Sequence, residues 1–162
     1  MKTLLLMRHA KSSWNHPNLS DHQRPINKRG RRDAPRMGAF LKEQGIEVDT
    51  ILCSTAQRTR ETLSLFLKEF TFKNEVQFFD ALYHADLRDY IGELAKLPTE
   101  IESAMIIGHN PTMSYALDFF CDEYVHFPTA AIARIAFKIG AWDKLIENPD
   151  GKLMNYWIPK GI

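Results

Sequence analysis

Residues 4–15 read LLLMRHAKSSWN and place an arginine and a histidine at the point where an apolar run stops. The run from Lys2 to Met7 predicts a short buried strand, because continuous apolar runs of this length are typical of strands covered on both faces. The following segment, Arg8 to Pro25, is rich in turn-forming residues and long for a connection without secondary structure. Such loops often carry functional residues. Whether His9 is an ordinary turn residue or a functional group depends on what else reaches this end of the strand.

Strands and helices alternate along the rest of the chain. Strands are predicted at 50–53, 76–79, 104–107, 130–139 and 153–158, and helices at 27–45, 56–70, 87–97 and 111–121. Short apolar strands between helices predict an α/β fold, a three-layer α/β/α sandwich with a mostly parallel central sheet. The last two strands lack a helix between them and predict an antiparallel edge. Pro35 lies inside the first helical pattern, which would allow a break or a late start of that helix.

Composition limits the functions that the chain can be expected to have. Its 162 residues suit a single domain spanning 1–162, and no repeat or low-complexity segment divides it. With 21 Lys and Arg against 20 Asp and Glu, the charge balance gives no support to nucleic-acid or membrane-surface binding. No apolar run approaches the roughly 20 residues of a membrane span, and the N-terminal run is too short for a signal peptide. Cys53 and Cys121 form no evident framework, so a reduced cytoplasmic setting is expected, although counting leaves a single disulfide open.

Polar side chains follow each of the first four predicted strands. In an open parallel sheet, ligands bind outside the carboxyl ends of the strands, so these side chains should meet at one edge. They are Arg8 and His9, then Ser54 and Arg58, then Tyr83 and His84, and finally His109 and Asn110, which come directly after Gly108. Two arginines favour an oxyanion, because guanidinium groups match phosphate oxygens and stay charged. A histidine among such charges should have a lowered pKa and remain a neutral nucleophile. If its Nδ1–H donates to a backbone carbonyl, Nε2 keeps the lone pair that attacks phosphorus.

Four segments of the chain resemble the histidine phosphatase superfamily, whose fold is called phosphoglycerate mutase-like. In LLLMRHAKSSWN, Arg8, His9, Ser12 and Asn15 match the signature in order and spacing, with Ala10 where glycine is usual. RPINKRGRRDAPRMGAFL resembles the segment leading into the first helix, CSTAQRTRETL the second arginine motif, and GHNPTMS the second histidine motif. The similarity extends from Lys2 to about Leu117. The short chain and the variants RHAKSSW, LYHA and GHNP are most similar to the phosphohistidine phosphatase SixA branch.

The resemblance implies a role for each matching residue. His9 would be the phosphate-accepting nucleophile, and Arg8, Arg58 and His109 would complete the phosphate pocket. Ser12 and Asn15 are candidate substrate-binding residues. The implied enzyme is a cytoplasmic, metal-independent phosphatase that forms a phosphohistidine on His9, needs no organic cofactor, acts on phosphohistidine of a signalling protein and is monomeric.

One position departs from the superfamily pattern. Many members place a Glu or Asp after the third strand as the general acid, but FFDALYHA puts His84 there. Asp80 comes too early, and Asp86 and Asp89 lie a turn or more into the next helix. General acid assistance is worth about 100- to 10,000-fold for a poor leaving group such as an alkoxide. Imidazole leaves more easily, so the sequence favours a phosphohistidine substrate or another phosphate with an easy leaving group. His84 is a candidate substrate-facing residue, and its service as the acid is the alternative.

Alternatives from other classes stay open at this stage. One is a phosphomonoesterase acting on a small phosphorylated metabolite, and another is a phosphoglycerate mutase-type isomerase, which would need to hold and return the phosphoryl group. CSTAQRT resembles the Cys-x5-Arg loop of cysteine-dependent phosphatases, but only four residues separate Cys53 from Arg58. A non-catalytic phosphate-binding module is disfavoured because the pocket residues are all present.

Several other charged and histidine residues are given ordinary roles. The basic run of Lys28, Arg29, Arg31, Arg32 and Arg36 predicts a solvated helix face that could steer an acidic phosphoprotein towards the site. His16, His22 and His126 are interpreted as loop residues, and no metal site is expected. Whether the loop from Ser12 to Arg24 closes as a lid stays open.

Overall fold

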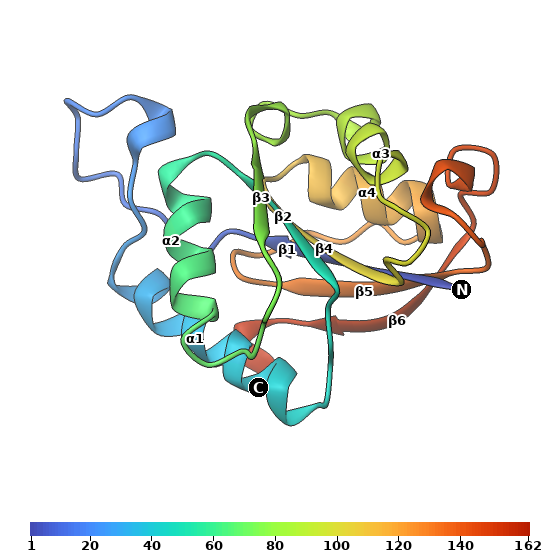
Figure 1. Cartoon of the computed structure of the whole chain (residues 1–162). Coiled ribbons are helices and arrows are strands. Elements are labelled where there is room, and N and C mark those ends of the chain that lie inside the picture. The colour runs from blue at the N-terminus through green and yellow to red at the C-terminus, as the bar shows by residue number, and fades with distance from the viewer.

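A computed structural model describes residues 1–162 and shows one six-stranded sheet with helices on both faces (Figure 1). The strands are β1 (Lys2–Arg8), β2 (Thr50–Ser54), β3 (Val76–Phe79), β4 (Ser103–Gly108), β5 (Ile132–Phe137) and β6 (Gly151–Trp157). The helices are α1 (Lys28–Glu43), α2 (Gln57–Phe66), α3 (Leu87–Ala95) and α4 (Thr112–Cys121). Single 3-10 turns occur at Asp21–Gln23, Asp80–Leu82, Trp142–Lys144 and Pro159–Gly161. Every predicted strand and helix is therefore confirmed, with shifts only at the ends.

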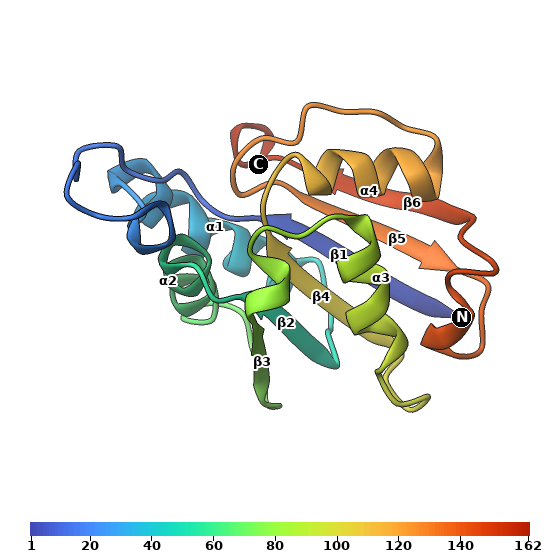
Figure 2. The ribbon, with the colours of Figure 1, turned by 90° about the horizontal axis from the view of Figure 1, so that it is seen from above.

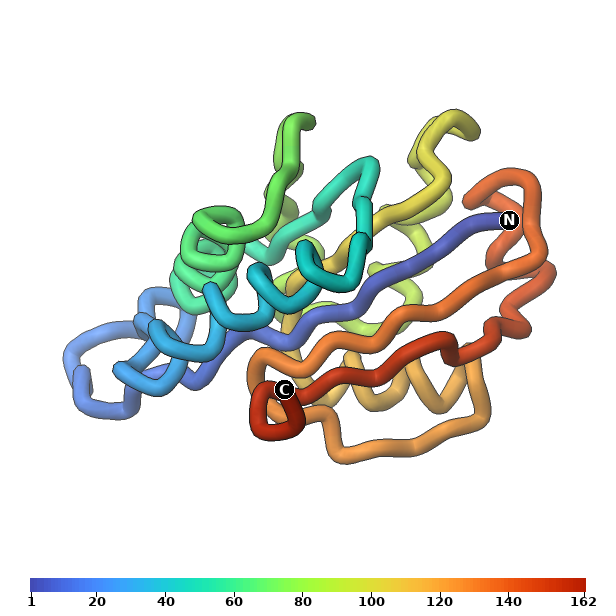
Figure 3. The backbone as a smooth tube through the Cα atoms, turned by 90° about the horizontal axis from the view of Figure 1, so that it is seen from below, coloured from blue at the N-terminus to red at the C-terminus, as the bar shows by residue number.

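The order of strands across the sheet is β3-β2-β4-β1-β5-β6. The pairs β2–β3, β2–β4 and β1–β4 are parallel, whereas β5 runs antiparallel to both β1 and β6. Figure 3 shows β1, β5 and β6 side by side along one edge. The predicted mostly parallel sheet with an antiparallel edge is confirmed. The carboxyl ends of β1, β2, β3 and β4 consequently point the same way.

The core lies in two layers, one on each face of the sheet. Alternate residues of β1 face opposite layers, with Leu4 and Leu6 in one cluster and Leu5 and Met7 in the other. Helices α3 and α4 cover the first layer and lie in front of the sheet in Figure 2. Helices α1 and α2 cover the second and lie in front of it in Figure 3. This confirms the three-layer sandwich and explains why the central strands are apolar without alternation.

Helix α1 is continuous through Pro35, so the break or late start considered near this residue is wrong. Asn27 caps the helix by accepting a hydrogen bond from the Gly30 N–H at 2.9 Å. The inward face buries Met37 and Leu41 completely. Burying large apolar side chains contributes about 1.5–3 kcal/mol each, which offsets the roughly 3 kcal/mol cost of an interior proline.

Helices α1 and α2 approach closely at Gly38, and this contact generates a stability prediction. A Cβ at Gly38 would overlap the backbone carbonyl of Phe66, which cannot retreat without moving α2. We expect Gly38→Ala to lower the free energy of unfolding by about 1–3 kcal/mol, the usual cost of overpacking. Urea denaturation followed by circular dichroism measures this change.

The matched control is Gly92→Ala in α3, where an added Cβ meets nothing within 4 Å. Alanine favours helix more than glycine does, so this variant should gain about 0.5–1 kcal/mol. Equal effects at the two positions would contradict the close approach of α1 and α2.

Candidate active site

The pairing of β1 with β4 brings two histidines together. Arg8 lies opposite Gly108 in this parallel pair, and the His9 N–H donates to the Gly108 carbonyl at 3.0 Å. The Ala130 N–H donates in turn to the His9 carbonyl at 3.0 Å. These backbone bonds hold His9 beside the residue that follows β4. The His9 and His109 rings are therefore 5.3 Å apart between centroids.

The side chain of His9 is only 6% exposed and has a defined tautomer. Its Nδ1 lies 2.7 Å from the Ala10 carbonyl, which can only accept, so Nδ1 carries the proton. Burial, together with the charges of Arg58, Arg8 and Arg24, lowers the pKa of His9 to about 3 against the opposing effect of the Ala10 bond. The ring is neutral at pH 7, and Nε2 keeps its lone pair.

Three arginines surround this histidine, and each donates to a backbone carbonyl. The bonds are Arg8 to Phe127 O at 2.8 Å, Arg24 to Ser13 O at 3.1 Å, and Arg58 to Asp21 O at 2.8 Å. Carbonyl dipoles fix the guanidinium groups without cancelling their charge. Arg24 was missed by the sequence analysis, although it begins the RPIN segment that carries part of the family resemblance.

His109 is held by the residue that ends β2. Its Nε2 lies 2.8 Å from Ser54 Oγ, and that hydroxyl already accepts from the Ala56 N–H at 3.3 Å. With Ser54 donating to Nε2, the proton of the neutral ring lies on Nδ1. Burial, followed by the His9 and Arg58 charges, lowers the pKa of His109 to about 3. His109 Nδ1 and Arg8 Nε are both buried without a hydrogen-bond partner, as is the Tyr90 hydroxyl.

A carboxylate from the first loop enters this group. Asp21 Oδ1 accepts from Arg24 at 2.9 Å, and Oδ2 accepts from Arg58 at 3.1 Å and from the Tyr83 hydroxyl at 2.5 Å. The Tyr83 hydrogen bond is the largest cause that lowers the pKa of Asp21, and Arg24 and Arg58 add to it. The sequence analysis missed Asp21, because it sought a carboxylate only after the third strand.

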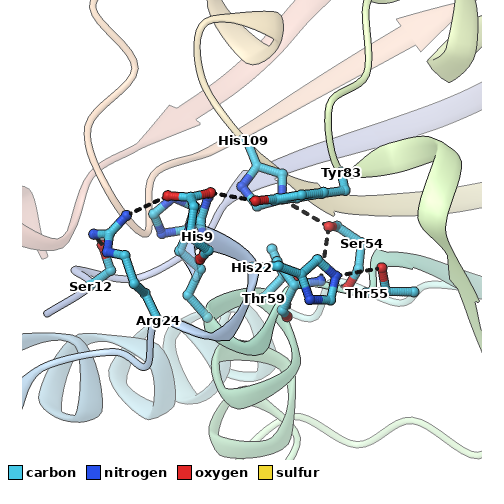
Figure 4. A network of polar contacts seen from close by, with 12 residues as sticks. His9, Ser12, His22, Arg24, Ser54, Thr55, Thr59, Tyr83 and His109 are labelled. Atoms are coloured by element: carbon cyan, nitrogen blue, oxygen red, sulfur yellow. Dashed lines mark hydrogen bonds and ion pairs between the residues drawn. The ribbon is translucent and has the colours of Figure 1, made fainter. Parts of the chain in front are cut away.

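Aromatic residues form the rim of the site. A hollow of about 310 Å³ is lined by Arg58, Tyr83, His84, His109 and their neighbours. His84 stacks on Tyr83 with 4.0 Å between ring centroids. His22 packs edge-on against Tyr83 at 4.6 Å, and its Nε2 lies 3.0 Å from Thr55 Oγ1 (Figure 4). The interpretation of His22 as an ordinary loop residue was therefore wrong, because the turn at Asp21–Gln23 folds it back onto the rim.

Two candidate substrate-binding residues lie elsewhere. Ser12 is buried and its Oγ accepts from Arg24 at 2.6 Å, so it positions that arginine (Figure 4). Asn15 is exposed and lines a separate hollow with His16, Arg29 and Arg31. The chain turns away after Ser13, whose carbonyl is held by Arg24. The structure thus does not bring Asn15 to the His9 group.

The carboxylates that follow β3 are engaged outside the hollow. Asp80 accepts from the Thr55 hydroxyl at 2.6 Å. Asp86 caps α3 by accepting from the Arg88 and Asp89 backbone N–H groups. The Asp89 carboxylate in turn accepts from the Asp86 N–H at 2.9 Å. No carboxylate of this segment lines the hollow, whereas His84 does.

Cys53 does not have the features of a catalytic thiol. Its side chain is fully buried in β2, and burial raises its pKa to about 12. A nucleophilic cysteine needs an exposed thiolate with a lowered pKa, so the cysteine-dependent phosphatase alternative is wrong. No group of three or more His, Cys, Asp or Glu side chains is arranged to hold a metal ion. No helix has the length and apolar character needed to cross a membrane.

A family model for the histidine phosphatase superfamily (branch 1) matches residues 4–115. This chain belongs to the histidine phosphatase superfamily. An uncharacterised protein of Mycobacterium leprae (strain TN) is 30% identical over 167 residues, which cover 95% of this chain and 100% of that protein. The matched segment contains Arg8, His9, Arg58 and His109, all of which the fold places at one edge of the sheet.

Solved structures extend the similarity over nearly the whole chain. A candidate phosphohistidine phosphatase SixA from Nakamurella multipartitia has a TM-score of 0.85 and 28% identity, covering 98% of this chain and 96% of that one. Another from Agrobacterium tumefaciens has a TM-score of 0.84 and 27% identity, covering 98% of both chains. The fold is phosphoglycerate mutase-like, and the family and these neighbours support a histidine phosphatase.

The two buried histidines predict a dependence of stability on pH. An unfolded chain binds protons at histidine near pH 6.5, whereas folded His9 and His109 stay neutral down to about pH 3. The unfolded state therefore binds more protons in this window, and stability falls as the pH falls. Between pH 7 and pH 5 we expect a loss on the order of 1–2 kcal/mol per histidine, measured by urea unfolding.

His9→Gln should lose less stability than the wild type over the same interval, because one of the two contributions is gone. His16→Gln, on the exposed part of the loop, is the matched control and should keep the wild-type slope. A slope unchanged in His9→Gln would show that this imidazole is not held neutral by the fold.

Proposed function

We propose that this protein is a phosphatase that transfers a phosphoryl group to His9 and then to water, with phosphohistidine of a signalling protein as its substrate. The observation that carries the proposal is the state of His9. Its Nδ1–H is fixed on the Ala10 carbonyl, its ring is buried and neutral, and guanidinium charges surround it. A neutral imidazole with a free Nε2 is a nucleophile, and the surrounding cations bind the group that it attacks.

The first step forms one bond and breaks one bond. The Nε2 lone pair attacks phosphorus, and the bond from phosphorus to the substrate nitrogen breaks with its electron pair leaving on that nitrogen. A proton from solvent or from a rim residue completes the departing imidazole. In the second step, water attacks the phosphorylated His9, the phosphorus–Nε2 bond breaks, and orthophosphate leaves.

The pocket stabilises charge on the three phosphoryl oxygens. Arg8, Arg24 and Arg58 supply positive charge at fixed positions, because backbone carbonyls hold their guanidinium groups. The unpartnered Arg8 Nε and His109 Nδ1 are the donors that the phosphoryl oxygens would satisfy. His109 contributes a hydrogen bond without a charge, since its ring is neutral at pH 7.

The rim favours a leaving group that needs little help with its proton. The segment after β3 presents His84 and Tyr83 to the hollow, and its carboxylates point elsewhere. A neighbouring face of α1 exposes Lys28, Arg29, Arg31, Arg32 and Arg36, which would attract an acidic phosphoprotein. Both observations favour phosphohistidine on a protein over an alkyl phosphate metabolite. A small phosphorylated metabolite remains the alternative substrate. A mutase-type isomerase is less favoured, because the segment after β3 places no carboxylate general acid in the hollow.

Trapping the intermediate tests the proposed nucleophile. Rapid quenching during turnover of a ³²P-labelled phosphoryl donor should give label on His9 that is lost in acid and retained in base. Mass spectrometry of peptides from the base-quenched protein locates it. His9→Ala should lose the label and turnover, because it removes the free Nε2, whereas Nε2 of the neighbouring His109 is bonded to Ser54.

His16→Ala is the control for this experiment and should keep both label and turnover. His16 lies on the exposed loop, away from the three arginines that surround His9. Full activity without label on His9 would refute the proposed phosphohistidine intermediate.

A second experiment compares leaving groups. A phosphohistidine peptide should be hydrolysed at least about 100-fold faster, in kcat/KM, than the same peptide carrying phosphoserine, because the alkoxide lacks a general acid. An aryl phosphate, whose leaving group needs no proton, should also be turned over.

The aryl phosphate separates leaving-group chemistry from recognition of the imidazole ring. Phosphoserine hydrolysed as fast as phosphohistidine would contradict the assignment of the substrate while leaving the role of His9 intact.

A further inference from the structure

The Asp21 carboxylate pairs with two of the arginines that line the pocket, Arg24 and Arg58. Arg58 donates to it twice, through one nitrogen to the backbone carbonyl at 2.8 Å and through the other to Oδ2 at 3.1 Å. Arg24 donates to Oδ1 at 2.9 Å, and the Tyr83 hydroxyl donates to Oδ2. The carboxylate thus takes two of the three guanidinium groups proposed to bind phosphate. A phosphoryl group and Asp21 cannot hold the same donors at the same time.

We propose that Asp21 competes with incoming anions for the Arg24 and Arg58 guanidinium groups and thereby lowers the affinity of the pocket for them. This inference rests on the proposed function, since it concerns the same phosphate pocket. The Asp21 carboxylate stands in for the phosphoryl group when the pocket holds no substrate, and it withdraws when a more highly charged phosphoryl group arrives.

The carboxylate is placed where withdrawal costs little. The Asp21 side chain is 47% exposed, whereas the Arg24 and Arg58 side chains that hold it are each 9% exposed. A released Asp21 therefore returns to water, while the arginines keep their positions. Rotation of the Asp21 side chain alone releases its bonds to Arg24 and Arg58, while the Asp21 backbone carbonyl continues to hold Arg58.

The competing charge has a consequence for substrate and product alike. A carboxylate carries one negative charge, and a phosphoryl group carries up to two, so the pocket favours the phosphoryl group over its own carboxylate. The apparent affinity for any anion is lowered by the fraction of molecules in which Asp21 has withdrawn. Orthophosphate, the product, has no contacts outside the pocket to offset this loss. Asp21 thereby limits product inhibition and occupation by common small anions.

Binding of orthophosphate to the intact protein, measured by isothermal titration calorimetry, tests the inference without needing turnover. Asp21→Asn keeps the size of the side chain and removes its charge. We expect this variant to bind orthophosphate about 10-fold more tightly than the wild type, which corresponds to Asp21 withdrawing in about one molecule in ten. In turnover assays, the KM and the orthophosphate inhibition constant should fall together.

A matched control separates direct competition from bulk charge. Asp80→Asn removes the same charge from the same rim, but Asp80 contacts Thr55 and none of the three arginines. It should leave orthophosphate affinity within about twofold of the wild type, since exposed charges are screened by solvent and salt. An equal gain in Asp80→Asn and Asp21→Asn would overturn the inference.

Tyr83→Phe provides a test that changes no charge. It removes one of the hydrogen bonds that hold Asp21, so affinity should rise about threefold, within the range of a single hydrogen bond. The same change made in Asp21→Asn should have no effect, because the carboxylate it restrains is gone. This double-mutant cycle measures the coupling directly. Weaker phosphate binding in Tyr83→Phe would show that the hydroxyl serves the ligand and would overturn the inference.

The remaining outcomes distinguish this inference from the proposed function. Unchanged orthophosphate affinity in Asp21→Asn, with label still trapped on His9, would overturn the competitor role alone. Unchanged affinity with a large loss of kcat would assign Asp21 to proton transfer instead, which also overturns it. Tighter binding in Asp21→Asn without any label on His9 would support the competitor role and refute the phosphatase mechanism.

Discussion

The parallel pairing of β1 with β4 is the constraint on which the rest of the site depends. Arg8 lies opposite Gly108, so the residues that follow, His9 and His109, emerge side by side at the carboxyl edge. The bond from the His9 N–H to the Gly108 carbonyl extends the pairing one residue beyond the strand. A slip of this register by one residue would send each of Leu4 to Met7 into the opposite core layer and move both histidines. The two core layers therefore fix the register, and the register fixes the positions of His9 and His109.

The second constraint is electrostatic, because three guanidinium groups lie close together and the Asp21 carboxylate is the one acidic side chain paired with them. Backbone carbonyls of Phe127, Ser13 and Asp21 hold them in place, and the indole of Trp14 stacks 3.4 Å from the Arg24 guanidinium carbon. Carbonyls and aromatic faces orient cations without neutralising them, so the field at His9 stays positive. That field, added to burial, keeps the imidazole neutral. Repulsion among the three guanidinium groups is unfavourable and is offset by the rest of the folded structure. A bound anion reduces this repulsion.

The sequence predicted the fold and the residues attached directly to strand ends, for a physical reason. Apolar strands separated by helices leave few arrangements other than a covered parallel sheet, and Arg8, His9, Arg58 and His109 follow its strands closely. Residues of the first loop were harder to predict. Asp21, His22 and Arg24 have no strand or helix period to fix their direction, and they reach the site through a 3-10 turn and a network of side-chain bonds. The continuity of α1 through Pro35 was missed because local propensity says nothing of the tertiary packing that outweighs it.

The first loop is anchored at both ends, which limits how it can act as a cover. Ser12 forms a β-bridge with Ile26, and the Arg24 side chain donates to the Ser13 carbonyl. These bonds hold the two ends of the loop together. The outer segment from Asn15 to Ser20 is exposed and makes few contacts with the rest of the chain. Closure of the whole loop over a small ligand would break the anchors that position Arg24. Rotation of the Asp21 side chain would not, and it would leave the rim at Tyr83 and His84 open.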